Sequence, residues 1–362
     1  MDSARANTGP SNSATLDPSA VESRALTAAA RLRVVAIGGG TGLSTLLRGL
    51  RRHVSIPGQP TSEAAQIADL AAVVTVTDDG GSSGRLRKDF NMLPPGDLRN
   101  CMVALSEEED VLTKLFAHRF RSGDTLEGHN FGNLFVAALT ELTGDFAHAI
   151  QLASKILATR GRIYPVTTAN ATLVARMDNG AFVRGETSIT ASRQHIAELM
   201  LDPPDAAAVP ETLDAIERAD LITVGPGSLY TSLITNLLVK GIPDALARAR
   251  GVRVYICNLM TQANESLGLS ASEHIKRIYE HTHAPIFDYA IVNTAPFSST
   301  TLARYAAENA APIVADIDRI QALGVRCITG DFAVEDNVVR HEANRVTTSL
   351  LALARTHRRH SR

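Results

Sequence analysis

The sequence predicts an α/β fold: a Rossmann-like, mostly parallel sheet with helices on both faces and a small antiparallel β-hairpin extension. Short β-branched segments alternate with amphipathic helical segments along much of the chain. Glycine-rich turns follow several of the predicted strands, and one pair of short strands flanks an Asn-Gly step, a strong hairpin signal. Such alternation favours parallel strands joined by crossover helices.

The first half of the chain opens with a strand, a glycine turn and a helix. The β-branched segment 32–37 ends in glycines, and leucines then recur at helical spacing from Leu43 to Leu50. A polar loop over 55–68 precedes a second predicted strand over 71–77. Apolar periodicity then predicts helices over 111–120, 131–142 and 146–157.

The second half begins with the predicted hairpin, whose arms are residues 172–177 and 181–185 around Asn179-Gly180. The strand–helix alternation then resumes. Strands are predicted at 221–224, 252–258 and 289–293, and helices at 229–239, 270–281 and 341–354.

Composition describes an ordinary globular protein of 362 residues, with 44% hydrophobic and 20% charged residues. A net charge of −2 gives no electrostatic reason to expect a nucleic acid as partner. The three cysteines, Cys101, Cys257 and Cys327, are far apart in sequence, which indicates free thiols in a reducing compartment. No membrane span and no signal peptide are recognisable, so we expect a cytoplasmic protein.

Three parts of the chain differ in composition. Residues 1–30 are rich in Ser, Ala, Thr and Asn without apolar periodicity, which predicts a disordered leader. Residues 31–355 are predicted to form a single α/β domain, because no linker inside them is long or polar. Residues 356–362 form a basic tail.

Candidate ligand-binding residues follow the carboxyl ends of the predicted strands, where open α/β sheets bind their ligands. The first strand ends in Gly38-Gly39-Gly40-Thr41-Gly42, which would let the backbone approach a phosphate at a helix start. Leu43 replaces the third glycine of the dinucleotide fingerprint, and no Walker lysine follows. A tight strand-to-helix turn without a ligand is the alternative.

The second predicted strand ends in two adjacent carboxylates, Asp78 and Asp79, which are the candidate ligands for Mg²⁺. They could also accept hydrogen bonds from sugar hydroxyls, and the alternative is a solvated turn. The flexible segment after them offers donors for phosphate oxygens. These are Gly81, Ser82, Ser83 and Arg85.

Four further clusters continue this pattern. Asp97 is predicted to cap a helix whose first turn directs Arg99 and Asn100 to the ligand. His129 is a candidate general base or positioning residue at another helix start. The remaining candidates are Asn130, Asn133, Gly225, Gly227, Ser228, Tyr230, Asn258, Thr261 and Gln262.

These motifs, in this order, resemble the gluconeogenesis factor family, which is related to the 2-phospho-L-lactate transferases (CofD). The resemblance covers residues 33–355. Its carriers are Gly38-Gly39-Gly40-Thr41-Gly42, Thr77-Asp78-Asp79-Gly80-Gly81-Ser82-Ser83-Gly84, Pro94-Pro95-Gly96-Asp97-Leu98-Arg99-Asn100, Gly128-His129-Asn130-Phe131-Gly132-Asn133, Gly225-Pro226-Gly227-Ser228-Leu229-Tyr230-Thr231-Ser232 and Asn258-Leu259-Met260-Thr261-Gln262.

The resemblance implies a bacterial regulator that binds a UDP-sugar, UDP-N-acetylglucosamine, and supports growth and cell shape on gluconeogenic carbon sources. The regulator that the resemblance implies requires no cofactor, although Mg²⁺ is compatible with its site. The resemblance leaves open whether the protein forms a homo-oligomer or has protein partners. The alternative is a Mg²⁺-dependent phosphotransferase acting on a nucleotide-activated small acid. The transferases carry a second acid where this chain has Arg99, which removes a metal ligand and favours binding without turnover.

Overall fold

The computed structural model describes residues 31–55, 65–107, 111–192, 194–262 and 265–360. Contacts divide the chain into Met1–Arg31 and Leu32–Arg362, and every helix and strand below belongs to the second unit. The predicted leader over 1–30 therefore lies outside the described residues, as does most of the polar loop predicted over 55–68.

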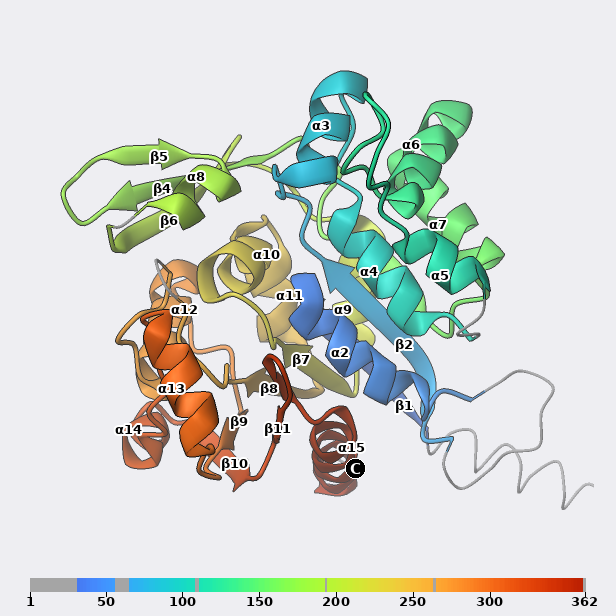
Figure 1. Cartoon of the computed structure of the whole chain (residues 1–362). Coiled ribbons are helices and arrows are strands. Elements are labelled where there is room, and N and C mark those ends of the chain that lie inside the picture. Colours follow the sequence, from blue (N-terminus) through green and yellow to red (C-terminus); the bar gives the residue numbers. More distant parts are fainter. Residues whose placement is uncertain (1–30, 56–64, 108–110, 193, 263–264, 361–362) are drawn as a thin grey trace, which may run out of the picture. The chain divides into compact units, whose positions relative to one another are not determined.

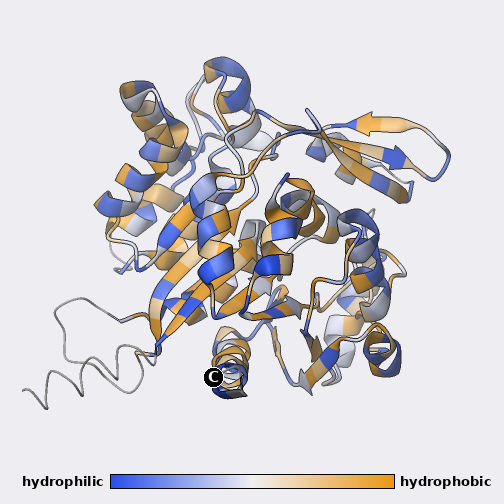
Figure 2. Cartoon of the chain, turned by 180° about the vertical axis from the view of Figure 1, so that it is seen from behind, coloured by the Kyte–Doolittle hydropathy of each residue, from blue (hydrophilic) through white to orange (hydrophobic). Residues whose placement is uncertain are grey.

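A seven-stranded parallel sheet with the order β10-β9-β8-β7-β1-β2-β3 forms the centre of this unit (Figure 1). Its strands are apolar over most of their length (Figure 2). The strands are β1 Leu32–Gly38, β2 Ile67–Val74, β3 Arg162–Pro165, β7 Leu221–Val224, β8 Val252–Ile256, β9 Tyr289–Asn293 and β10 Arg326–Gly330. The predicted Rossmann-like α/β class is confirmed.

Helices cover both faces of the sheet. On one face α2 packs against α4 and α15, and on the other α9 packs against α11 (Figure 1). The leucines that predicted α2 are all buried. The helices are α2 Gly40–Arg51, α3 Gly81–Phe90, α4 Gly96–Leu105, α5 Val111–Ala117, α6 Phe131–Thr143, α7 Phe146–Ile156, α8 Glu186–Ala191, α9 Pro210–Arg218, α10 Thr235–Leu238, α11 Ile242–Arg248, α12 Ala271–Thr282, α13 Ser299–Ala307, α14 Ile317–Ala322 and α15 Ala343–His360. Among these, no helix is both long enough and apolar enough to cross a bilayer.

The predicted hairpin is confirmed and belongs to a small antiparallel sheet with the order β5-β4-β6. Its strands are β4 Thr172–Met177, β5 Phe182–Arg184 and β6 Ile196–Asp202. The sequence analysis missed β6. A separate two-stranded sheet pairs β11 Ala333–Glu335 with β12 Val339–His341.

Apart from shifted ends of other elements, three local predictions near the candidate site differ from the structure. The segment after Asp78-Asp79 is helix α3 rather than a flexible loop, since Ser82 and Ser83 are buried in its first turn. Strand β2 begins at Ile67 and ends at Val74, which is earlier than expected at both ends. The predicted helix 229–239 begins as a π-helical turn, η1 Leu229–Ile234, and continues as α10.

The strand order reverses between β1 and β7, because the chain moves from β1 to β2 in one direction and later returns to β7 on the other side. Such a reversal leaves a crevice at the carboxyl ends of the two strands. The two glycine turns, which follow β1 and β7, therefore lie on either side of this crevice.

Candidate ligand site at the strand reversal

A cavity of about 300 Å³ lies at the strand reversal and is bounded by both glycine turns. The turns approach so closely that a Cβ on Gly42 would collide with the Pro226 carbonyl, which explains the glycine there. Nine of the predicted ligand-binding residues line this cavity: Gly39, Gly40, Thr41, Gly42, Gly227, Ser228, Asn258, Thr261 and Gln262.

The cavity lining offers mainly backbone amides, side-chain amides and hydroxyls. The amides of Thr41 and Gly42 lie in the first turn of α2, where no intrahelical acceptor is available. Across the cavity Gln262 Nε2 donates to Ser228 Oγ at 3.0 Å. Among the described residues that line the cavity, none is acidic. This chemistry suits an anion with attached polar groups.

Asp97 contacts the first glycine turn but does not line the cavity. Its Oδ2 accepts the Gly40 amide at 2.8 Å, and a Cβ on Gly39 would lie 2.7 Å from the same oxygen. Asp97 is thus not the N-cap of α4, a position that Pro95 occupies. Burial raises the pKa of Asp97 to about 6, and the charge of Asp78 also raises it. The carboxylate therefore orients the glycine turn from outside the cavity.

Behind Asp97, four polar side chains satisfy one another; we call Ser82, His129, Asn130 and Asn133 the amide–hydroxyl cluster. Ser82 Oγ accepts the Asn130 amide and Asn133 Nδ2, both at 3.3 Å. Its own proton is then donated to His129 Nδ1 at 3.2 Å, so that His129 Nε2 carries the ring proton. Burial, followed by the charge of Arg85, lowers the pKa of His129, which agrees with a neutral ring.

This cluster determines where α3 and α6 begin. Ser82 is in the first turn of α3, and Asn130 caps α6 by accepting the Asn133 amide at 3.2 Å. All four side chains are at most 6% exposed. They do not line the cavity at the strand reversal. Their contacts therefore assign them a positioning role in this structure.

Three arginines surround the same segment; we call Arg85, Arg99 and Arg119 the arginine cluster. Arg85 Nη2 donates to the Glu127 carbonyl at 2.8 Å, and Arg119 Nη1 donates to the Gly128 carbonyl at 2.6 Å. Arg99 Nε donates to Asn133 Oδ1 at 3.3 Å. Within the described ranges, none of the three forms an ion pair with a carboxylate. The sequence analysis missed Arg119.

The two candidate metal ligands are each held by neighbouring backbone. Asp78 Oδ1 accepts the Gly80 amide at 2.8 Å. Asp79 Oδ1 accepts both the amide and the hydroxyl of Thr187, at 2.8 and 2.6 Å, and so fixes the start of α8. In the part of the chain that the structure describes, no three His, Cys, Asp or Glu side chains are grouped to hold a metal ion. A Mg²⁺ ion here would depend on phosphate and water ligands for most of its coordination.

Two further carboxylates, which sequence reasoning missed, interact with this acidic region. Burial raises the pKa of Glu186 to about 9, and the charges of Asp78, Asp97 and Glu265 raise it further in the same direction. Burial also raises the pKa of Glu265, whose Oε1 accepts the Thr231 amide at 2.9 Å. Both are far in sequence from the acids that they face, so no local pattern could reveal them.

The remaining predicted residues lie outside the cavity lining. Gly38 ends β1, and its carbonyl accepts Asn236 Nδ2 at 3.0 Å. Gly225 adopts φ +93° in the second turn. Tyr230 is 2% exposed, and its hydroxyl donates to the Ile196 carbonyl of β6 at 3.3 Å. The others are Gly81 and Ser83 in the first turn of α3 and Asn100 in α4.

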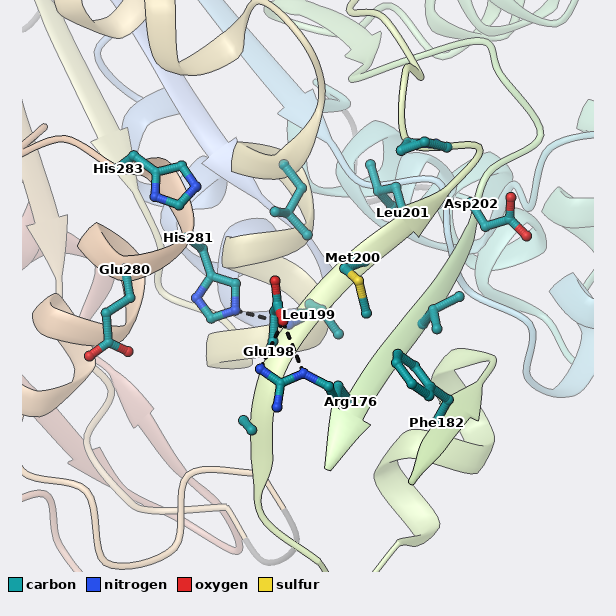
Figure 3. A pocket seen from close by; sticks show the side chains of 14 residues that line it. Arg176, Phe182, Glu198, Leu199, Met200, Leu201, Asp202, Glu280, His281 and His283 are labelled. Atoms are coloured by element: carbon teal, nitrogen blue, oxygen red, sulfur yellow. Dashed lines mark hydrogen bonds and ion pairs between the residues drawn. The ribbon is translucent and has the colours of Figure 1, made fainter. Parts of the chain in front are cut away.

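A second and larger cavity, of about 700 Å³, lies between the small sheet and the end of α12 (Figure 3). Arg176 pairs with Glu198 across β4 and β6, and His281 Nε2 accepts the Leu199 amide at 3.0 Å. His281 Nδ1 then donates to the Arg277 carbonyl. None of the predicted ligand-binding residues lines this cavity, and its carboxylates are paired, Glu198 with Arg176 of the lining and Asp202 and Glu280 with arginines outside it.

Comparison with known proteins places the chain in a family. The family model described as 2-phospho-L-lactate transferase CofD matches residues 34–333. The chain is 46% identical over 319 residues to the gluconeogenesis factor of Halalkalibacterium halodurans, which covers 88% of this chain and 95% of that one. The chain belongs to the gluconeogenesis factors of the CofD family. The gluconeogenesis factor of Bacillus subtilis is 42% identical over 322 residues, covering 89% of this chain and 98% of its own.

A crystal structure of a Bacillus halodurans protein shares the fold of this gluconeogenesis-factor chain. It superposes with a TM-score of 0.83 at 44% identity, over 89% of this chain and 99% of the other. The sequence-based assignment to the family is thereby confirmed.

Proposed function

We propose that the chain is a cytoplasmic regulator that binds UDP-N-acetylglucosamine at the strand reversal and supports growth and cell shape on gluconeogenic carbon. The observation that carries the proposal is the cavity formed by the two glycine turns. The diphosphate would accept the amides of Thr41 and Gly42, and the positive end of the α2 dipole favours its charge. The side chains of Asn258 and Gln262 would contact the sugar or the base.

Binding without turnover is supported by the chemistry of the lining. His341 is the imidazole in the cavity, and burial lowers its pKa to about 4. Its Nε2 is directed to the Cys257 carbonyl at 3.1 Å, so the ring is a neutral donor and a weak base. The acids of the neighbouring region contact backbone groups rather than the cavity.

Isothermal titration with UDP-N-acetylglucosamine tests the proposal, and Thr41 offers a matched pair of variants because its side chain is exposed at the mouth of the cavity. Thr41→Glu places a carboxylate beside the diphosphate, whereas Thr41→Gln has nearly the same size without the charge. We expect Thr41→Glu to weaken binding at least tenfold relative to Thr41→Gln, about 1.4 kcal/mol. No heat with the wild-type chain at millimolar ligand would overturn the proposal.

The alternative is a Mg²⁺-dependent phosphotransferase, and the acidic region near the cavity favours it. Asp78 would share a Mg²⁺ ion with ligand phosphates, and the ion would offset the charge that raises the pKa of Glu186. This alternative predicts formation of a product that requires Mg²⁺, and loss of turnover in Asp78→Asn with ligand binding largely retained. Mg²⁺-independent binding without a product favours the regulator.

A further inference from the structure

The arginine cluster is unusual because its three guanidinium groups come from separate elements to one short segment. Arg85 belongs to α3, Arg99 to α4, and Arg119 follows α5. All three donate to groups between residues 127 and 133. A Cβ on Gly128 would lie 3.1 Å from Arg85 Nη2, so this glycine allows the guanidinium to approach the backbone.

The hydrogen-bond acceptors of this cluster are neutral, and in the described ranges none of its guanidinium groups forms an ion pair with a carboxylate. Each guanidinium carries five N–H donors, and two of the three arginines use one of them on a backbone carbonyl. Burial lowers the pKa of Arg99, and the positive charge of Arg119 lowers it further, against the opposing effect of Asp97. Like charges near one another repel, and an anion bound among them would relieve this repulsion.

The segment that the arginines contact is closed by backbone hydrogen bonds. Phe120 closes the turn through two backbone hydrogen bonds: its amide donates to the His129 carbonyl, and its carbonyl accepts the Gly128 amide, both at 2.9 Å. The Phe131 amide donates to the His118 carbonyl at 2.8 Å. The amide–hydroxyl cluster holds the other side through Ser82. The guanidinium groups therefore contact a segment whose backbone is itself fixed by hydrogen bonds.

We propose that the arginine cluster is a second anion site, separate from the cavity at the strand reversal, and that it takes the phosphate group of a small phosphorylated molecule. Planar guanidinium groups bind phosphate oxygens through paired N–H donors. Two of the three arginines are not needed to balance any carboxylate charge in the described ranges, because Arg85 and Arg119 contact only carbonyls. None of the three lines the cavity between the glycine turns.

The test titrates inorganic pyrophosphate into the full chain carrying Thr41→Glu, which keeps the probe from the glycine turns. Arg119→Gln removes one exposed guanidinium of the cluster. The control, Arg250→Gln, removes an exposed guanidinium outside the cluster, between α11 and β8. We expect pyrophosphate to bind, Arg119→Gln to weaken it at least tenfold, and Arg250→Gln to change it less than twofold. Equal losses in both variants, or no binding, would overturn the proposal.

A crossed titration separates this proposal from the proposed function. UDP-N-acetylglucosamine binding should be weakened by Thr41→Glu and should change less than twofold in Arg119→Gln. Pyrophosphate binding to the second site should be weakened by Arg119→Gln and should not be weakened by Thr41→Glu. Loss of both ligands in Arg119→Gln would mean one shared site and would overturn the second site alone. Hydrogen exchange adds an independent readout: pyrophosphate should slow exchange in residues 118–133, and slowing confined to residues 38–45 would contradict the proposal.

Discussion

The cavity at the strand reversal and the amide–hydroxyl cluster carry the same kinds of residue, yet they differ in what these residues contact. At the cavity the amides of Thr41 and Gly42 lie in a helix turn that has no acceptor of its own. In the cluster Ser82, His129 and Asn133 satisfy one another. Polar residues of the same kinds can thus be available to a ligand or fix where helices begin, and their hydrogen bonds tell the two roles apart.

Removing the centre of the cluster should have the largest effect and should act on stability. Ser82→Ala leaves the Asn130 amide, Asn133 Nδ2 and His129 Nδ1 without their common partner in a buried site. We expect the free energy of unfolding to fall by about 3 kcal/mol, since each buried unpaired polar group costs about 1–3 kcal/mol. Denaturant unfolding measures this loss.

Ser299→Ala in the exposed first turn of α13 is the control for that change and should be nearly neutral. The affinity of folded Ser82→Ala for UDP-N-acetylglucosamine should remain within twofold of wild type. A tenfold loss of affinity at unchanged stability would show that the cluster contacts the ligand, and the distinction between the two regions would then fail.

Much of the central sheet could be predicted from sequence because its signals are local. Four leucines at helical spacing specify α2, and Asn179-Gly180 specifies the β4–β5 turn. Strands β3, β6 and β10 were missed, and β6, for example, lacks the β-branched run that marked the predicted strands. Helix α3 was missed because its Gly-Ser-Ser-Gly start has weak helix propensity, which tertiary contacts of Ser82 overcome.

The candidate site was predictable only in part. The strand ends located the glycine turns, which the structure brings together around one cavity. Arg119, Glu186 and Glu265 could not be found, because long-range folding alone places them beside the other charged groups. Sequence likewise could not separate Gln262, which lines the cavity, from Tyr230, which is buried against β6.

The acidic region next to the cavity should make stability depend on pH above pH 6. The pKa of Glu186 is about 9 in the folded chain and ordinarily 4.5, so the folded state keeps a proton that the unfolded state releases. Stability should therefore fall as pH rises between these values. Solvent screening reduces the effect at this half-buried group, so we expect a loss of about 1 kcal/mol between pH 6 and 8.5.

Thermal melts across this range measure the slope. Glu186→Gln should flatten it, because the neutral amide has no proton to lose, whereas exposed Glu308→Gln should keep the wild-type slope. A stability that rises with pH in the wild-type chain would contradict the assigned direction of the pKa shift.

Tyr230 should affect packing rather than ligand binding. Tyr230→Phe removes the donor to the Ile196 carbonyl and should cost about 1 kcal/mol of unfolding free energy. Tyr289→Phe on β9 is the matched control. If Tyr230→Phe instead weakens UDP-N-acetylglucosamine binding tenfold without a change in stability, this residue belongs to the ligand site after all.

The smallest expected effect is at the cavity rim. Gln262 is exposed and donates to Ser228, so Gln262→Ala should weaken UDP-N-acetylglucosamine about threefold, near the 0.5–1.5 kcal/mol of one net hydrogen bond. Gln321→Ala on α14 should leave affinity unchanged. Titration calorimetry distinguishes the two, and equal affinities would remove Gln262 from the site.

A crystal structure of the full chain with UDP-N-acetylglucosamine tests the central claim most directly. We predict diphosphate oxygens within hydrogen-bond distance of the Thr41 and Gly42 amides, between the two glycine turns, with Asp97 still bonded to Gly40. A ligand bound instead among Ser82, His129 and Asn133, with the glycine turns unoccupied, would contradict the account.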